Sequence, residues 1–361
     1  MKIDDYFDMT RFDDIHYNFS KIDGYNKPFN FIISGREPGK STQLDCFKIM
    51  WPIFCGEPVV YFVRNATEIS PELIESLEGV INKWTINPVK FIYKNSSFGK
   101  CCVDIYFNDK IAIRFISMTI KKNTIKRLVL KGIKYIVFDE FILDMSCGEK
   151  YITGEYSKFQ EIYTTLKRER PGLKCYFCGN PYSLYNPYFE GLGIDASQLT
   201  YGEITTGDNW AVEYYKMSDK LREKILKENP FYKFDNDKFD DYTAYGVEGK
   251  PVNDANIPLL PSIPSNYSLY VIFKITGTYL AVWRASALIK TEFKYFICKT
   301  QAPKNRVAYC FDFTDLVEGT KILSYSDRLK FENIRRAMRE RSIAFKDIAC
   351  YYKFVDVYSF L

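Results

Sequence analysis

The sequence predicts an α/β fold in which a parallel sheet is covered by helices on both faces. Strand-like and helix-like segments alternate through the first two thirds of the chain, several strands are apolar throughout, and a glycine-containing loop joins the first strand to a helix. Uninterrupted apolar strands are typical of parallel sheets, because both faces of such a sheet are buried. With 361 residues, the chain is long enough for two domains.

The elements of the first domain follow from hydrophobic periodicity and from turn residues. Strands are expected over residues 29–34, 59–64, 91–93, 103–107, 111–116, 135–138 and 174–178. Helices are expected over 40–51, where Pro52 should stop the helix, over 71–83, which begins with a proline, and over 156–168. These segments define a first domain over residues 1–201.

The periodic pattern weakens between residues 202 and 265, where polar and turn-rich sequence such as NPFYKFDNDKFDDYTAYG and PLLPSIPS takes over. A linker is expected here. Strands then follow over 268–275, 279–284 and 294–298, and a charged helix over 327–341 is expected to close the chain. The sequence thus predicts a smaller α/β or α+β domain over residues 266–361.

Composition excludes several classes of protein. A hydrophobic content of 47% excludes a disordered chain, and no apolar run is long enough to cross a bilayer. The acidic N-terminus has no apolar segment of the kind a secretion signal needs, so a cytoplasmic protein is expected. The ten cysteines lie mostly in apolar runs and are expected to be reduced. Cys175 and Cys178 form a CxxC without a second pair, so a core strand is favoured over a metal site.

Basic charge gathers in the C-terminal part of the chain. Residues 266–361 contain 16 lysines and arginines but only 9 aspartates and glutamates, whereas the whole chain has a net charge of +5. A polyanionic partner would suit this distribution, although a solvated surface would have the same composition. His16, the single histidine, is expected to be an ordinary surface or half-buried residue, and histidine-dependent catalysis is not expected.

A phosphate-binding loop is expected between the first strand and the following helix. Backbone N–H groups of such a loop face the phosphates, Lys40 would reach the β and γ oxygens, and the Ser41 hydroxyl would bind Mg²⁺. Strict spacing of the motif would require glycine at Ser34, which is small enough for the turn. The loop comprises Ser34, Gly35, Arg36, Glu37, Pro38, Gly39, Lys40, Ser41 and Thr42.

Two carboxylates follow the apolar strand YIVF at residues 135–138. Ligands of open α/β sheets bind at the carboxyl ends of the strands, so Asp139 and Glu140 should lie near the loop. Asp139 would hold Mg²⁺ through water, and Glu140 would orient and activate the hydrolytic water. Together the two motifs predict an ATP-binding and ATP-hydrolysing site. Tyr25, just before the first strand, is a guess for stacking on the base.

These motifs, with CYFCGNP at 175–181 and NPYF at 186–189, resemble those of the DNA-packaging ATPases of small short-tailed phages, compact relatives of the large terminases. The resemblance covers the first domain and, more faintly, the second through LYVIFKITGTYLAVW at 269–283. It implies a P-loop ATPase domain of the ASCE type. It also implies an ATP-driven motor that moves double-stranded DNA through a portal into a preformed capsid.

The resemblance suggests roles for individual side chains. Arg36 matches an arginine that senses or stabilises the γ-phosphate, and Asn180 matches a coupling residue that reports the nucleotide state. Arg168 and Arg170 lie where the family has its trans-acting arginine finger, and Lys167 aligns about as well with some spacings. A solvated helix end explains this basic cluster equally well.

Other basic residues are nucleic-acid candidates. Arg64 ends the second strand as an arginine does in the relatives, although Asn65, Ala66 and Thr67 replace a neighbouring lysine that some of them have. A segment that resembles the family's lid contributes Lys121, Lys122, Lys126 and Arg127. The charged helix of the second domain contributes Arg328, Lys330, Arg335, Arg336, Arg339 and Arg341, which would contact nucleic acid or the portal.

In large terminases the second domain is an RNase H-like nuclease that holds two metals with carboxylates. Here its first strand reads YVIFK at 270–274, with no acid at the expected metal ligand, so the resemblance implies a vestigial nuclease fold. Membership would further imply a homo-oligomeric ring, a pentamer in this family, docked at the procapsid portal in the host cytoplasm, directly or through an adaptor.

Three functions therefore remain. The leading one is a ring-forming DNA translocase. The second is a terminase-like ATPase that also cleaves DNA, which the missing strand acid disfavours. The third is a nucleotide-gated DNA-binding protein with little hydrolysis, which Glu140 disfavours.

Overall fold

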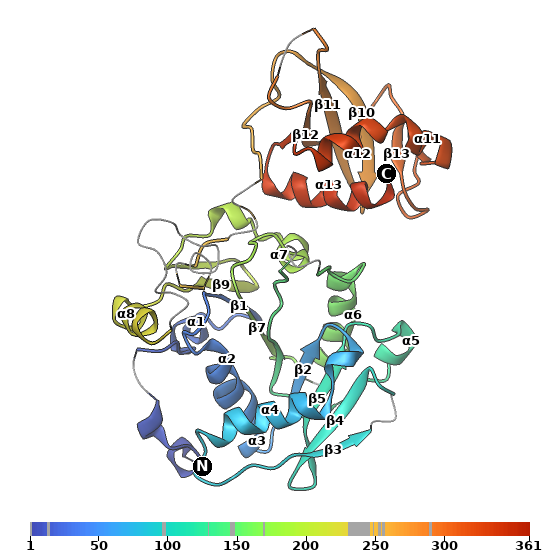
Figure 1. The fold of residues 1–361 in the computed structure, drawn as a ribbon. Coiled ribbons are helices and arrows are strands. Elements are labelled where there is room, and N and C mark those ends of the chain that lie inside the picture. Colours follow the sequence, from blue (N-terminus) through green and yellow to red (C-terminus); the bar gives the residue numbers. More distant parts are fainter. Residues whose placement is uncertain are drawn as a thin grey trace. The chain divides into compact units, whose positions relative to one another are not determined.

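A computed structural model describes residues 2–12, 15–95, 99–128, 130–144, 149–168, 170–229, 246–247, 249–251, 254, 257–288 and 291–361. The chain forms two compact units, Met1–Asn253 and Asp254–Leu361, and each is described by itself (Figure 1). Among the described helices, none combines the length and the apolar composition that a membrane crossing requires.

The first unit is built on a nine-stranded sheet with the strand order β3-β4-β5-β2-β6-β7-β1-β9-β8. The six strands from β5 to β9 in this order are parallel, and β3, β4 and β8 are added antiparallel at the edges. The strands are β1 (Phe29–Ile33), β2 (Val59–Val63), β3 (Ile92–Asn95), β4 (Cys102–Phe107), β5 (Lys110–Ser117), β6 (Tyr135–Phe138), β7 (Lys174–Gly179), β8 (Ile204–Thr206) and β9 (Trp210–Tyr214).

Helices cover both faces of this sheet, as the sequence predicts. The helices are α1 (Ser20–Gly24), α2 (Lys40–Gln43), η3 (Leu44–Met50), α3 (Trp51–Phe54), α4 (Pro71–Asn82), α5 (Lys122–Ile125), α6 (Glu155–Lys167), α7 (Pro187–Leu192) and α8 (Asp219–Glu228), with short 3-10 turns at Ile3–Asp5, Met9–Arg11, Ala66–Glu68 and Ala196–Gln198. One core packs against α6 and α7, the other against η3, α3 and α4 (Figure 1). Within β1, Phe31 and Ile33 enter the first core and Ile32 the second. This explains why most positions of the central strands are apolar.

The helix after the loop does not stop at Pro52. It runs from Lys40 to Phe54, and its middle section, η3, is a π-helix in which the Trp51 N–H donates to the Cys46 carbonyl. A proline ring clashes with the carbonyl four residues earlier in an α-helix, and the wider π turn relieves that clash. The predicted end at residue 51 is therefore wrong.

The predicted boundary at residue 201 is also wrong. Strand β9 pairs in parallel with β1, and β8 pairs with β9, so the sheet extends to Tyr214. Helix α8 then packs through Leu221 and Ile225 on Met217 and Val247. These two strands are short and their helix is strongly charged, so their apolar pattern is weak in the sequence. Residues 230–245, the centre of the predicted linker, lie outside the described residues.

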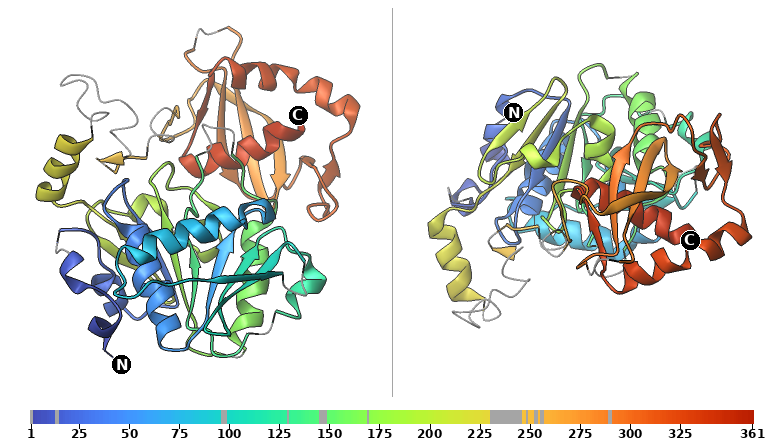
Figure 2. Two further views of the ribbon diagram at one scale, coloured as in Figure 1. Left: turned by 60° about the horizontal axis from the view of Figure 1, so that its bottom comes forward. Right: turned by 90° about the horizontal axis from the view of Figure 1, so that it is seen from above.

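The second unit has a six-stranded sheet with the order β14-β13-β10-β11-β12-β15. Strands β10, β11 and β12 are antiparallel, whereas β13, β14 and β15 each pair in parallel with their neighbour. Figure 2 shows its two longer helices in red beside the sheet. The elements are β10 (Tyr267–Ile275), β11 (Thr278–Ala285), β12 (Tyr295–Thr300), β13 (Ala308–Cys310), β14 (Thr320–Ile322), α11 (Tyr325–Lys330), α12 (Glu332–Arg339), β15 (Ile343–Phe345) and α13 (Ile348–Phe360).

The helical end of this unit differs from the prediction in two ways. The expected helix over 327–341 is divided at Phe331. The backbone of this residue departs from helical angles, and its side chain is buried against Tyr270 and Phe273. A further helix, α13, then closes the chain and buries Phe354 and Val357. Its sequence, IACYYKFVDVYSF, has no clear polar face, so helical periodicity did not reveal it.

Candidate nucleotide-binding site

The predicted phosphate loop lies where expected, between the end of β1 and the start of α2. Gly39 has φ +85° and forms the N-cap of α2, a left-handed conformation that favours glycine. Glu37 also has positive φ, at +67°. Ser34 is 1% exposed, and its N–H donates to the Gly179 carbonyl over 3.2 Å. A small residue therefore fits the first position of the loop.

Lys40 is buried beside neutral oxygen atoms. Its Nζ donates to Asn180 Oδ1 over 2.7 Å and to the Gly35 carbonyl over 3.5 Å, and the residue is 7% exposed. Among the described residues it has no ion-pair partner. Burial lowers the pKa of Lys40, and the nearby Asp139 carboxylate opposes this effect. A buried cation with neutral partners is a place where a phosphate would fit.

The two acids at the end of β6 lie in the same site. The Glu140 N–H donates to Asp139 Oδ1 over 3.0 Å, and Glu140 adopts φ +57°. Partial desolvation, followed by the Asp139 carboxylate, raises the pKa of Glu140. The Ser41 hydroxyl and the Asp139 carboxylate are oxygen ligands of the kind that Mg²⁺ takes, so this donor set fits the metal.

Arg36 and Asn180 both face this site from predicted positions. Asn180 directly follows β7, which lies between β1 and β6 in the sheet. Arg36 donates to the Tyr182 hydroxyl over 2.9 Å, so its guanidinium is tied to the segment that begins with Asn180. The loop, the acids and Asn180 therefore come together at one edge of the sheet, as the sequence predicts.

Arg64 is not a DNA-facing residue, contrary to the prediction. It is 7% exposed, and its guanidinium pairs with the buried Glu155 at the start of α6, with a closest N–O distance of 3.1 Å. It also donates to the backbone carbonyls of Glu140 and Phe141, over 3.4 and 3.0 Å. The Tyr188 hydroxyl donates to the same carboxylate over 2.8 Å. Sequence reasoning missed this role because the partner of Arg64, Glu155, is 91 residues away in the chain.

The candidate finger residues lie at the opposite end of β7. They precede this strand, whereas the phosphate loop packs on the residue that ends it. Six residues of strand span roughly 20 Å, so these side chains do not reach the phosphates of their own loop. Arg170 is paired with Glu57 over 3.1 Å, Lys167 lies over the Tyr163 ring, and Arg168 is exposed.

The other basic candidates are mostly exposed. Lys122 pairs with Glu161 over 2.8 Å, and Lys121, Lys126 and Arg127 are exposed around α5. On α12, Arg335 and Arg339 both pair with Glu332, over 3.2 and 3.1 Å. Arg336 donates to Asn333 over 2.6 Å. Part of the basic charge of this helix is therefore balanced within the helix.

Cys175 and Cys178 are buried core residues of β7, and burial raises the pKa of both thiols. No group of three or more histidine, cysteine or acidic residues that could hold a metal ion occurs among the described residues. Tyr25 ends α1 at the start of β1, opposite the phosphate loop, so the guess that it stacks on a base is wrong.

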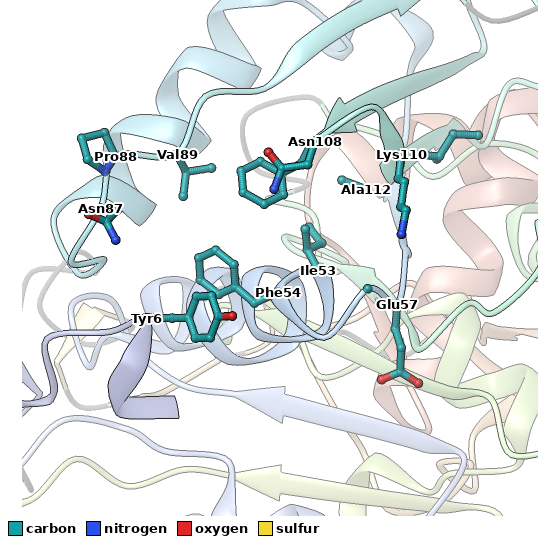
Figure 3. A pocket seen from close by; sticks show the side chains of 13 residues that line it. Tyr6, Ile53, Phe54, Glu57, Asn87, Pro88, Val89, Asn108, Lys110 and Ala112 are labelled. Carbon is teal, nitrogen blue, oxygen red and sulfur yellow. The ribbon is translucent and has the colours of Figure 1, made fainter. Parts of the chain in front are cut away.

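Cavities open on the described part of the first unit. One, of about 420 Å³, lies between the end of α3, the segment after α4 and the β4–β5 turn (Figure 3). Tyr6, Phe54 and Phe107 form its aromatic wall, with Glu57 and Lys110 also lining it. No predicted nucleotide-site residue lines this cavity. The second, of about 490 Å³, includes the phosphate loop and is lined by Phe12, His16, Glu37, Pro38, Gly39, Lys40, Ser41, Thr42, Gln43 and Trp84.

Comparison with protein families places this site in context. Residues 12–353 match the podovirus DNA encapsidation protein (Gp16) family. The chain belongs to this family. The chain is 27% identical over 175 residues to the DNA packaging proteins of Bacillus phages phi29 and PZA. That alignment covers 48% of the chain and 49% of each relative, so the chain spans about half the length of the curated relatives it matches.

Two solved structures have a fold similar to that of this chain. A chain of the bacteriophage phi29 genome packaging motor assembly superposes with a TM-score of 0.66 and 18% identity, covering 96% of this chain and 99% of that one. A chain of the phi28 gp11 DNA packaging motor superposes with a TM-score of 0.57 and 17% identity, covering 92% and 94%. At these identities the likeness concerns the fold.

Proposed function

We propose that this chain is the ATPase of a motor that drives double-stranded DNA into a preformed phage capsid. The observation that carries the proposal is Lys40, a buried cation with neutral partners, set between a phosphate loop and Asp139 in a chain of the encapsidation family. The phi29 relatives are named DNA packaging proteins, which supports the same activity here.

In this proposal each side chain of the site has its own role in ATP hydrolysis. Lys40 and the loop N–H groups would hold the β- and γ-phosphates, and Ser41 and Asp139 would hold Mg²⁺, which would balance phosphate charge when bound. Glu140 takes the proton from the attacking water, a role that its raised pKa favours. Asn180, which accepts a hydrogen bond from Lys40, would report the nucleotide state through this contact, and Arg36 would sense or stabilise the γ-phosphate.

We further propose that subunits form a closed ring and complete one another's sites. The basic cluster at 167–170 lies at the opposite end of β7 from its own loop, which supports action on a neighbour's nucleotide. Arg168 is the better finger, because Arg170 is already paired with Glu57. The ring would be a pentamer that docks at a portal, directly or through an adaptor, in the host cytoplasm. Exposed Lys122, Lys126 and Arg127 are candidates for contact with DNA.

The second unit is proposed to be an RNase H-like fold without nuclease activity. The meander β10-β11-β12 with β13 and β14 added in parallel beside β10 supports this relationship. The first strand of this unit has no acid over residues 270–274, and its last residue there, Lys274, is 7% exposed. Its Nζ lies 3.2 Å from the Asp315 carbonyl and 3.9 Å from the Asp315 carboxylate. A buried ammonium at this position opposes the binding of two divalent cations.

The test of the proposal is Lys40→Met, which keeps the bulk of the side chain but removes its charge. ATP hydrolysis, measured as phosphate release with and without DNA, should fall by several orders of magnitude, because the β- and γ-phosphates lose their cation. The circular dichroism spectrum should not change. A folded Lys40→Met protein with normal turnover would contradict the assignment of the site.

A further inference from the structure

We infer that Phe12, His16 and Trp84 form the pocket for the base of the bound nucleoside triphosphate. The inference deepens the proposed function and rests on it. The three side chains come from the N-terminal segment and from the end of α4, and they line the same 490 Å³ cavity as residues 37–43 of the phosphate loop and α2.

The position of this cavity relative to the phosphates supports the inference. Lys40 Nζ, Asp139 and Asn180 mark the place of the terminal phosphates, and neither acid of β6 lines the cavity. The cavity instead follows the other side of the loop, along Pro38, Gly39 and Thr42. A nucleoside attached at the α-phosphate must leave the loop on the side away from the catalytic acids. It would therefore enter this cavity.

Aromatic side chains line the same cavity as the loop residues. The rings of Phe12 and Trp84 pack with centroids 4.4 Å apart, and Phe12 also packs on Phe47 at 5.0 Å. Phe12 and Trp84 are half-buried, so each ring keeps part of its surface exposed. An exposed aromatic face attracts a heteroaromatic base by stacking, whatever the base.

The N-terminal wall of the cavity is attached to the phosphate loop. The Tyr17 N–H donates to the Pro38 carbonyl over 2.8 Å, and a Cβ on Gly39 would lie 3.5 Å from the Cβ and Cδ2 atoms of His16. Asn229 Nδ2 donates to Glu37 Oε1 over 3.0 Å on the same loop. The wall and the loop therefore keep a fixed distance, as a ligand that bridges them requires.

The first experiment compares ATP with inorganic tripolyphosphate, which has no base, by calorimetric titration of the full-length protein. Phe12→Leu keeps an apolar side chain but removes the aromatic face. It should raise the Kd for ATP about ten-fold and leave the Kd for tripolyphosphate within about two-fold. Tyr93→Leu, at an exposed aromatic residue on β3, is the matched control and should change neither.

Three results would overturn the inference in distinguishable ways. If Phe12→Leu weakens ATP and tripolyphosphate equally, Phe12 supports the loop and does not hold the base. If it weakens neither, the base lies elsewhere. If the unmodified protein binds neither ligand, the proposed nucleotide site itself fails.

Photolabelling gives an independent readout. 8-Azido-ATP carries its reactive group on the base, so mass spectrometry of the labelled peptides should identify the segment around Phe12 and His16 or the one around Trp84. Excess ATP should prevent the labelling. Labelling confined to peptides that contain Tyr25, or to any other segment, would contradict the assignment.

Discussion

The guanidinium of Arg64 donates to the Glu155 carboxylate and to the backbone carbonyls of Glu140 and Phe141. The carboxylate has two further donors, the Tyr188 hydroxyl and the Ile152 N–H. These contacts join the end of β2 to the loop after β6 and to the start of α6. Glu140 keeps its left-handed backbone beside this pair. At the residue scale, Arg64 therefore holds the backbone at Glu140 and Phe141 from within the protein.

Removal of Arg64 should cost stability. Arg64→Ala leaves the carboxylate of Glu155, a residue 1% exposed, without its cation, and breaking such a buried pair costs about 3–5 kcal/mol. Urea denaturation should show this decrease in the free energy of unfolding. Lys122→Ala is the control, because its pair with Glu161 is exposed and contributes less than about 1 kcal/mol. If Arg64→Ala left stability unchanged and weakened DNA binding, Arg64 would contact DNA, as the sequence predicts.

The sequence was a good guide to individual residues where chain neighbours determine their position. Ser34 to Thr42 and Asp139–Glu140 lie where a strand and a helix place them locally. Arg64, Phe12 and Trp84 were misjudged or missed because their partners are distant in the chain, as Glu155 is from Arg64. No local pattern encodes such contacts.

At the scale of elements, long apolar strands were predicted and short or polar ones were not. Strand β6 begins and ends at the predicted residues, and β2 and α4 differ from their predictions by one residue. Strand β9 has only five residues, one of them the buried Glu213. A charged residue within a short strand weakens the apolar pattern, so the final parallel strand was assigned to a linker.

Glu213 should make the stability of this edge of the sheet depend on pH. Burial raises its pKa to about 7 from an ordinary 4.5, although the Tyr17 hydroxyl donates to it over 3.0 Å and Lys21 lies nearby. The folded state thus holds the proton more tightly than the unfolded state. The contribution of Glu213 to the free energy of unfolding is fully present below about pH 4.5. It is lost as the pH rises through about 7, and it amounts to about 3 kcal/mol at most.

Chemical denaturation at pH 5.5 and pH 8 checks this expectation. Glu213→Gln keeps the shape of the side chain and should make the difference in unfolding free energy between the two pH values smaller by about 2 kcal/mol, because this range covers only part of the titration. Glu203→Gln, at an exposed position near β8, should leave the difference unchanged. An equal pH dependence in the Glu213→Gln protein would show that other groups are responsible.

At the scale of the whole molecule, the two units carry different chemistry. The first holds the phosphate loop and the two acids that follow β6, and the second holds a buried Lys274 beside Asp315. The purified protein should therefore not nick supercoiled plasmid in Mg²⁺ or Mn²⁺, as agarose gels would show. Nicking that follows the protein through purification and disappears in Asp312→Asn or Asp315→Asn would overturn the proposed loss of nuclease activity.

Subunits of the proposed ring should depend on one another for ATP hydrolysis. An arginine finger supplied by a neighbour is worth about 10³ to 10⁵ in rate in other ATPases and GTPases, so Arg168→Ala should bind ATP and hydrolyse very little. Glu140→Gln should also bind ATP but lack the base for the water. In a mixed ring, an intact Arg168 from a Glu140→Gln subunit meets an intact Glu140 in an Arg168→Ala subunit. Mixing two inactive proteins should therefore restore part of the hydrolysis.

The matched control combines both changes in one chain. Arg168→Ala mixed with the Arg168→Ala/Glu140→Gln double variant offers no intact finger to any site, so phosphate release should stay at the level of the single variants. Co-assembly of each mixture is checked with two different affinity tags. Arg170→Ala, tested in the same way, decides between the two arginines, and its pairing with Glu57 predicts that it gives no such complementation. If neither arginine variant regains activity in co-assembled rings, the cluster acts within its own subunit or holds structure, and the trans assignment is wrong.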